Sequence, residues 1–396
     1  MQKKIIDSVD NTNIQTITAF KADCITVVMF LLFFIGVGIG LFIKKDVKFS
    51  EQENRYLAER PELSLSALSS GRYEKEYETY LSDQFPFRNQ WITLRTITEL
   101  LMQKKEVNGV YFAEDDYLIE LKDSENYESE QAAKNIEYLE EFVRNNSEGM
   151  DNSFSILLVP DKSAVLRNKL PASAETADEW KIIKEIYDRC ESADCVDVYE
   201  ELEKHKEEYI YYRTDHHWTT QGSYYGYKAW CNETGIRENK QEEFIKTTVT
   251  ETFRGTLDSK VNLSLRSDSI DVYELKEPVE YTLVYDYGAL TEHTLFDMKK
   301  LASKDKYGVF LGGNHSLVEI HTTVKNGKSI LLIKDSFANS FIPYLINQFE
   351  NIYVLDLRYY NQSLSEYMEK RKITDILVLY SLAGFVQDDN IYKLKS

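Results

Sequence analysis

Cysteine is scarce in this sequence. The 396 residues include four cysteines, which form no Cys-x-x-Cys pair and stand at no Cys/His spacing typical of zinc sites. A structural zinc site is therefore not expected, and we expect no cofactor. If the folded part of the chain lies in an oxidising compartment, Cys190 and Cys195 can pair across a short loop, which would leave Cys231 unpaired.

Basic residues are also in the minority. The chain has 47 Lys and Arg against 66 Asp and Glu, so its formal net charge is -19. Because nucleic-acid binding needs clustered Lys and Arg, this balance argues against a nucleic-acid partner. The hydrophobic fraction of 43% is enough for a sizeable core, and we find no repeats or low-complexity tract. We expect a globular protein with one large domain or two.

Long apolar runs are absent apart from one near the N-terminus. The run CITVVMFLLFFIGVGIGLFI, residues 24–43, has the length of a membrane-spanning helix and ends in KKD without a cleavage site. It predicts an uncleaved membrane anchor rather than a secretory signal. We therefore divide the chain into a short cytoplasmic N-terminus (1–23), the anchor, a polar linker (44–66) and a folded domain (67–396).

The folded domain begins with helical patterns and then alternates strands with helices. Apolar residues recur at helical spacing in 72–85, 89–103 and 127–146. Farther on, short buried strands alternate with amphipathic helices, and 329–381 reads strand, turn, helix, strand, helix, strand, which predicts two crossovers of a parallel sheet. Residues 240–300 predict an insertion of strands and loops. The fold class is therefore three-layer α/β with a mostly parallel sheet.

Two turns carry residues that suit nucleophilic catalysis. TDHHW follows the predicted strand 208–214, and KDSF follows SILLIK. In a parallel sheet such turns meet beyond the carboxyl ends of the strands. Ser336 is predicted to begin a helix, where its N–H can face an oxyanion, while Asp215 and His217, two residues apart, can supply its base and the carboxylate that orients that base. The same pattern allows a helix cap at Ser336 and a noncatalytic polar turn.

A metal site is the other chemical use of the DHHW turn. Adjacent side chains of an extended segment point to opposite sides, so we expect His216 to be directed away from His217. No HExxH or similar ligand group lies nearby. The sequence thus favours the serine-based interpretation over a metal site.

TDHHW, with KDSFANSF downstream, resembles the DHHW-motif proteins, which are related to the SGNH-hydrolase-like alginate O-acetyltransferases. Further blocks carry the resemblance in the same order: SEQENRYLAERP (50–61), DQFPFRNQW (83–91), VPDKS (159–163), LGGNH (311–315) and DLRYY (356–360). The resemblance covers nearly the whole chain after the anchor. It implies an SGNH-hydrolase-like fold in which Ser336 is the nucleophile, His217 the general base and Asp215 the residue that orients it.

The resemblance also implies weaker assignments and one departure. Asn314, with the neighbouring Gly313, would supply oxyanion or substrate hydrogen bonds, and Arg358 would contact an acyl or sugar oxygen. Lys334 stands where classical SGNH esterases have the glycine of Gly-Asp-Ser. This departure leaves the geometry of the oxyanion site, and activity itself, open.

The resemblance further implies an extracytoplasmic location at the cell membrane. Lys and Arg are more frequent just after the apolar run than before it, which alone would leave the domain in the cytoplasm, but the family works on surface or secreted glycans. It implies O-acetylation of a polysaccharide acceptor, with a membrane-bound O-acyltransferase as acetyl donor. An acetylesterase uses the same residues, and a noncatalytic glycan-binding or assembly protein of exopolysaccharide biosynthesis is the alternative. The acidic charge favours a neutral or amino-sugar polymer.

Overall fold

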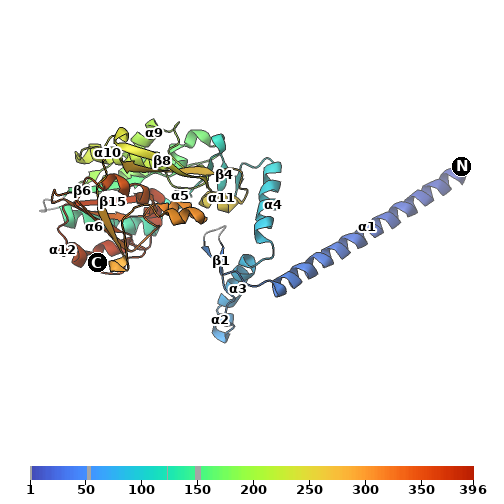
Figure 1. Cartoon of the computed structure of the whole chain (residues 1–396). Coiled ribbons are helices and arrows are strands. Elements are labelled where there is room, and N and C mark those ends of the chain that lie inside the picture. The colour runs from blue at the N-terminus through green and yellow to red at the C-terminus, as the bar shows by residue number, and fades with distance from the viewer. Residues whose placement is uncertain (1, 51–54, 123, 148–152) are drawn as a thin grey trace. The chain divides into compact units, whose positions relative to one another are not determined.

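The computed structural model describes residues 2–50, 55–122, 124–147 and 153–396. The chain forms two compact units, 1–94 and 95–396, whose boundary falls within one helix. Figure 1 labels their elements along the chain. Residues 51–54, part of the block at 50–61, lie outside the described residues.

The first unit begins with the long helix α1 (Gln2–Ile43). Within the described residues, Lys21–Leu41 is the one segment long and apolar enough to cross a membrane by length and composition. The unit continues with short elements, among which Asp83 accepts hydrogen bonds from the Arg55 guanidinium at 2.6 and 2.9 Å. These elements are β1 (Phe49–Ser50), β2 (Arg55–Tyr56), α2 (Leu65–Ser69), α3 (Arg72–Asp83) and the start of α4 (Arg88–Leu101).

The second unit is built on a mixed sheet. Its described strands follow the order β11-β10-β12-β14-β13-β15-β6-β7, in which β14 to β7 run parallel and β10, β11 and β12 pair antiparallel. β13 lies between β14 and β15, which confirms the two predicted crossovers. The strands are β6 (Ser153–Val159), β7 (Asp194–Cys195), β10 (Tyr281–Tyr285), β11 (Leu290–Glu292), β12 (Leu317–Thr322), β13 (Ser329–Lys334), β14 (Asn351–Leu355) and β15 (Asp375–Ser381).

Helices cover both faces of this sheet. Successive residues of a strand alternate between its faces, and in β13 Leu332 joins one buried cluster while Leu331 and Ile333 join another. Two separate cores on one sheet make the three-layer α/β arrangement, as predicted. The first core packs against α7 (Lys162–Val165), α9 (Val198–Lys204) and α10 (Thr220–Thr234), and the second against α6 (Glu130–Ser147), α8 (Glu179–Tyr187), α12 (Leu364–Glu369) and α13 (Leu382–Gln387).

Helix α10 follows its sequence signals closely. The Thr219 side chain accepts a hydrogen bond from the Gly222 N–H and caps the first turn. Gly235 ends the helix at φ 69°, a left-handed conformation that glycine adopts without strain. These two local signals place the helix directly after the DHHW turn.

Two predicted elements are wrong. Residues 208–214 form no sheet strand, since only an isolated bridge joins Tyr211 to Trp218. The helix expected at Ser336 is replaced by two short 3-10 segments, η7 (Ser336–Ser340) and η8 (Ile342–Leu345). In 208–214 the Asp268 carboxylate binds the N–H groups of Arg213 and Thr214. In η7 the side chains of Tyr307 and Trp218 bind backbone carbonyls. These long-range bonds override local periodicity.

Residues 240–300, predicted as an insertion of strands and loops, contain four strands, of which β10 and β11 belong to the eight-stranded sheet. β8 (Phe244–Phe253) and β9 (Asp268–Leu275) form an antiparallel ribbon, and α11 (Thr256–Val261) lies between them in the chain. The other described elements are β3 (Glu106–Val107), β4 (Val110–Phe112), β5 (Leu118–Glu120), α5 (Ser124–Tyr127) and 3-10 segments. All four cysteines are free thiols, so Cys190 and Cys195 are not bonded in this structure.

Candidate active site

The DHHW turn is a closed loop that leads into α10. Tyr211 pairs with Trp218, and the Tyr212 N–H donates to the His217 carbonyl at 3.2 Å. Trp218 is fully buried, and its indole N–H donates to the carbonyl of Phe337 at 2.9 Å. The tryptophan therefore joins the loop directly to the segment that carries Ser336.

Two buried charged residues hold the loop backbone. The carboxylate of Asp268 accepts from the N–H groups of Arg213 and Thr214, each at 2.8 Å. The Lys162 ammonium donates to the carbonyls of Tyr212 and Asp215 at 2.9 and 2.7 Å. Burial lowers the pKa of Lys162 to about 8. No local signal in the sequence marks Asp268, which comes from the inserted ribbon, whereas Lys162 lies in the VPDKS block.

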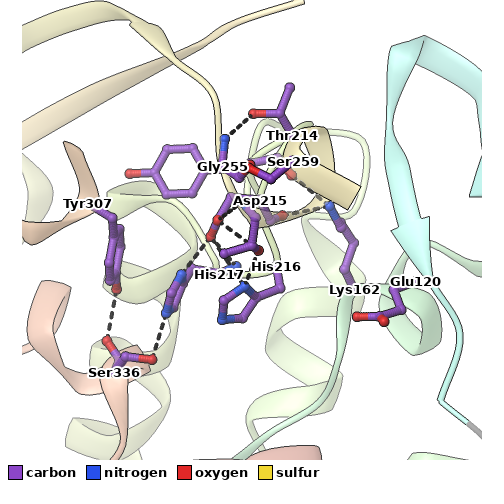
Figure 2. A network of polar contacts seen from close by, with 12 residues as sticks. Glu120, Lys162, Thr214, Asp215, His216, His217, Gly255, Ser259, Tyr307 and Ser336 are labelled. Carbon is purple, nitrogen blue, oxygen red and sulfur yellow. Dashed lines mark hydrogen bonds and ion pairs between the residues drawn. The ribbon is translucent and has the colours of Figure 1, made fainter. Parts of the chain in front are cut away.

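The structure brings Asp215, His217 and Ser336 into one hydrogen-bonded series (Figure 2). His217 Nδ1 lies 2.6 Å from Asp215 Oδ1, and His217 Nε2 lies 2.7 Å from Ser336 Oγ. Since an ionised carboxylate only accepts, Nδ1 carries the proton of the neutral ring and Nε2 is left to accept from the serine hydroxyl. This arrangement can take a proton from Ser336 as its oxygen attacks.

Asp215 is fixed by further donors. Its Oδ1 accepts from the His217 N–H at 3.0 Å, and its Oδ2 accepts from the N–H and hydroxyl of Thr256 at 2.8 and 3.1 Å. Burial raises the pKa of the carboxyl, but the two neighbouring imidazoles and these donors outweigh it and hold the pKa well below its ordinary value. Gly255 lies so close that an added Cβ would stand 2.2 Å from the Asp215 carboxylate. The sequence did not predict that Gly255 and Thr256 would contact Asp215.

His216 does not point away from His217, so that prediction is wrong. The centroids of the two rings are 3.9 Å apart, and His216 Nδ1 lies 2.8 Å from the Thr256 hydroxyl. The loop is a tight turn, so the alternation of an extended strand does not apply to it. Burial and the neighbouring His217 lower the pKa of His216 to about 3.

This placement brings together three side chains that can bind a metal ion, contrary to the prediction from the sequence. Ligand atoms of Asp215, His216 and His217 all lie within 4.8 Å of one another. However, each carboxylate oxygen of Asp215 already accepts two hydrogen bonds, and His217 bonds on both ring nitrogens. An ion bound by all three residues would have to replace those bonds, so the donor set fits the serine series better.

The turn that carries Ser336 is built on Asp335. Asp335 caps η7 by accepting from the Phe337 N–H at 2.9 Å, and it also accepts from the N–H and hydroxyl of Ser381 at 2.9 and 2.7 Å. Burial raises the pKa of this carboxyl against the opposing effect of Arg358. These bonds fix the start of η7 and hence the position of Ser336.

Tyr307 covers the histidine, a role that sequence reasoning missed. Its ring stacks on His217 with centroids 3.9 Å apart and an interplanar angle of 13°. Its hydroxyl donates to the carbonyl of Ser336 at 3.1 Å, as Figure 2 shows. Tyr307 thus contacts both partners of the Ser336–His217 hydrogen bond and restricts the ring orientation.

The weaker candidates lie at the ends of neighbouring strands. Asn314 is exposed, and its Oδ1 accepts from Lys334 Nζ at 3.0 Å and from Asn339 Nδ2 at 3.2 Å. The Gly313 N–H donates to the Phe310 carbonyl, so this amide is already engaged. Arg358 donates to Asp356 at 2.8 and 2.6 Å through Nε and Nη2.

The fold and site define an SGNH-hydrolase-like α/β protein. The family model for DHHW proteins matches residues 163–355, which include the whole Asp215–His217–Ser336 series. A DHHW family protein from Eubacterium siraeum is 28% identical, with a TM-score of 0.64 over 73% of this chain and 96% of that one. These findings confirm the DHHW resemblance that the motifs predicted.

A second solved structure is similar to this chain in its fold. PatB1 of Bacillus cereus, solved with a sulfonyl adduct, is 21% identical, with a TM-score of 0.60 over 72% of this chain and 98% of that one. No curated protein matches the chain.

Proposed function

We propose that this protein is a serine-dependent O-acetyltransferase or acetylesterase that acts on a cell-surface or secreted polysaccharide. The observation that carries the proposal is the hydrogen-bonded series from Ser336 Oγ through His217 to Asp215, with distances of 2.7 and 2.6 Å. A helix cap needs no histidine beside the serine, and a noncatalytic polar turn needs no stacked, oriented imidazole. The geometry therefore supports catalysis over both alternatives.

The proposed reaction proceeds in two steps. Ser336 Oγ attacks an acyl carbonyl carbon while His217 Nε2 takes the hydroxyl proton, and Asp215 stabilises the imidazolium. The tetrahedral intermediate expels the donor's leaving group, which takes the proton from His217, and leaves an acetyl ester on Ser336. An acceptor hydroxyl then gives its proton to His217 and attacks the ester carbonyl. The bond between the acyl carbon and Ser336 Oγ breaks, and His217 returns the proton to Ser336 Oγ. A sugar hydroxyl makes the enzyme a transferase, and water makes it an esterase.

The polysaccharide, the donor and the location follow from the family resemblance together with α1. The apolar segment Lys21–Leu41 would anchor the protein in the cell membrane, with the second unit on the extracytoplasmic side. A membrane-bound O-acyltransferase would supply acetyl groups at that surface. The net charge of -19 favours a neutral or amino-sugar acceptor, since a polyanion would be repelled.

The test is turnover of a chromogenic acetyl ester by the full chain in detergent, beside Ser336→Ala and His217→Ala. We expect turnover by the parent only, and intact mass should show one acetyl group on the parent. Ser340→Ala is the matched control, because Ser340 lies in the same segment η7 and bonds to Tyr307 rather than to histidine. An aryl sulfonyl fluoride provides a second probe, since activated hydroxyls attack sulfonyl groups and PatB1 carries a sulfonyl adduct.

Added sugar acceptors separate the two reactions. If acetylated oligosaccharide forms and less free acetate is released, the protein is a transferase. If free acetate is the one product, the protein is an esterase. If the parent, Ser336→Ala and His217→Ala are equally inert toward the ester and the sulfonyl fluoride, the enzymatic proposal is wrong. A noncatalytic glycan-binding or assembly role would then account for the fold.

A further inference from the structure

Lys334 is a buried lysine close in sequence to the proposed nucleophile. It is the last residue of β13, two positions before Ser336, and its side chain is 1% exposed. Its ammonium lies 3.3 Å from Asp356 Oδ2 and 3.0 Å from Asn314 Oδ1. A buried charge is costly unless it is paired, and Asp356 provides that pairing. The contact with Asn314 needs a separate explanation, because a lysine that served only to neutralise Asp356 would not need an exposed amide.

The ammonium determines which way the Asn314 amide faces. Lysine can only donate hydrogen bonds, so the Asn314 atom beside it must be the oxygen. Asn339 Nδ2 donates to the same oxygen at 3.2 Å. The two donors hold the oxygen, so the NH₂ group of the planar amide must face away from them, and Asn314 is an exposed residue. A cation on the carbonyl oxygen also polarises the amide, which makes its N–H groups stronger donors.

The two donors to the Asn314 oxygen lie on either side of the proposed nucleophile in the sequence. Lys334 lies two residues before Ser336, and Asn339 lies three residues after it in η7. Both bind one oxygen of Asn314, so Asn314 contacts the chain just before and just after the serine. When Ser336 attacks, negative charge develops on the acyl oxygen next to the serine, and fixed N–H donors stabilise that charge.

We propose that Lys334, together with Asn339, is a positioning residue that orients and polarises the Asn314 amide as an oxyanion donor for Ser336. This inference rests on the proposed serine chemistry and goes beyond it. The lysine that stands in place of the glycine of SGNH esterases thereby takes part in the site through its side chain. Asn314 would touch the reacting oxygen, whereas Lys334 and Asn339 act through Asn314.

The test is a double-mutant cycle on ester turnover by the full chain, with Lys334→Met, Asn314→Ala and the double variant. Removing one oxyanion donor costs kcat about 10²- to 10³-fold. We expect Asn314→Ala to fall in that range, Lys334→Met to lose about tenfold or more on kcat, and KM to change little in both. The double variant should equal Asn314→Ala alone, because Lys334 has nothing left to position. A purely structural lysine would instead give losses that multiply.

Asn339→Leu keeps the inference testable if Lys334→Met fails to fold. Asn339 is 2% exposed, and its Oδ1 has no hydrogen-bond partner among the described residues. Leucine therefore removes the donor to Asn314 Oδ1 at 3.2 Å and a longer contact with the Gly313 carbonyl at 3.5 Å. Its effect on kcat should also vanish in the Asn314→Ala background. The pH profile of kcat/KM should keep its shape in every variant, since none touches His217.

The outcomes separate this inference from the proposed function. A parent as inert as Ser336→Ala overturns both. A working parent in which Asn314→Ala leaves kcat unchanged overturns the oxyanion role alone. Multiplicative losses for Lys334→Met and Asn339→Leu in the Asn314→Ala background overturn the positioning role alone.

Discussion

Asp335 and Asp215, which stand on either side of the Ser336–His217 hydrogen bond, are held by different kinds of donor. Among the described residues, Asp335 accepts hydrogen bonds from neutral groups alone, namely the Phe337 N–H and both donors of Ser381, and burial raises its pKa. Asp215 accepts from an imidazole and Thr256, and its pKa is lowered. Both carboxylates are buried, but Asp215 has a hydrogen-bond partner that can become a cation, whereas the nearby Arg358 does not offset the effect of burial on Asp335. We infer that Asp335 maintains the turn that carries Ser336, whereas Asp215 takes part in the proposed reaction through His217.

Substitution of each aspartate by asparagine gives the largest contrast. Asp215→Asn should lower kcat by about 10⁴-fold, because the amide no longer holds the reactive tautomer of His217. Asp335→Asn should instead lower the free energy of unfolding by about 1–3 kcal/mol through its poorer match to the Ser381 donors. Ester turnover gives the loss of kcat in both variants, and urea unfolding gives the loss of stability. Equal losses of kcat in the two variants would contradict the different roles assigned to Asp215 and Asp335.

The glycines packed on each aspartate provide the second contrast. A Cβ on Gly255 would meet Cβ and Oδ2 of Asp215, both at 2.2 Å, whereas a Cβ on Gly384 would meet side-chain oxygens of Asp335 and Ser381, both at 2.6 Å. We expect Gly255→Ala to lower turnover about 100-fold, since the carboxylate must move. Gly384→Ala should mainly cost stability, about 1–3 kcal/mol. Turnover and thermal unfolding distinguish them, and an active Gly255→Ala would contradict the tight packing.

Thr256 allows a finer test of how Asp215 is held. Thr256→Val removes the hydroxyl that bonds to Asp215 and His216 but keeps the backbone N–H that donates to Asp215. We expect turnover to fall about tenfold, the effect of one hydrogen bond to a charged group. Thr256→Ser should restore it, because it returns the hydroxyl at nearly the same place. Equal turnover by the valine and serine variants would show that the hydroxyl is dispensable.

The smallest expected effect concerns His216 and pH. Its pKa is about 3 in the folded protein and about 6.5 when unfolded, so between these values only the unfolded chain binds the proton. Stability should therefore be full above pH 6.5 and fall on acidification toward pH 3. The side chain is 44% exposed, so water reduces the effect. His216→Gln should make the fall in melting temperature from pH 7 to 4 shallower, and an unchanged slope would contradict this.

Much of the fold could be predicted because its patterns are local. The buried strand SILLIK, the Thr219 cap and the two crossovers each depend on residues within a few positions. The candidate triad could also be proposed from the sequence, because strand ends meet at one edge of a parallel sheet. The predicted strand 208–214 was wrong because Asp268, more than fifty residues away, takes its backbone N–H groups.

The sequence by itself determined the three-layer α/β fold, the apolar N-terminal helix, the DHHW resemblance and the residues proposed for chemistry. Only the tertiary structure decided that His216 lies beside His217, that Thr256 and Gly255 hold Asp215, that Tyr307 covers the histidine, and that Lys334 binds Asn314. The physical reason is that periodicity and caps act over a few residues. The orientation of a buried polar group depends instead on donors and acceptors that folding brings from distant parts of the chain.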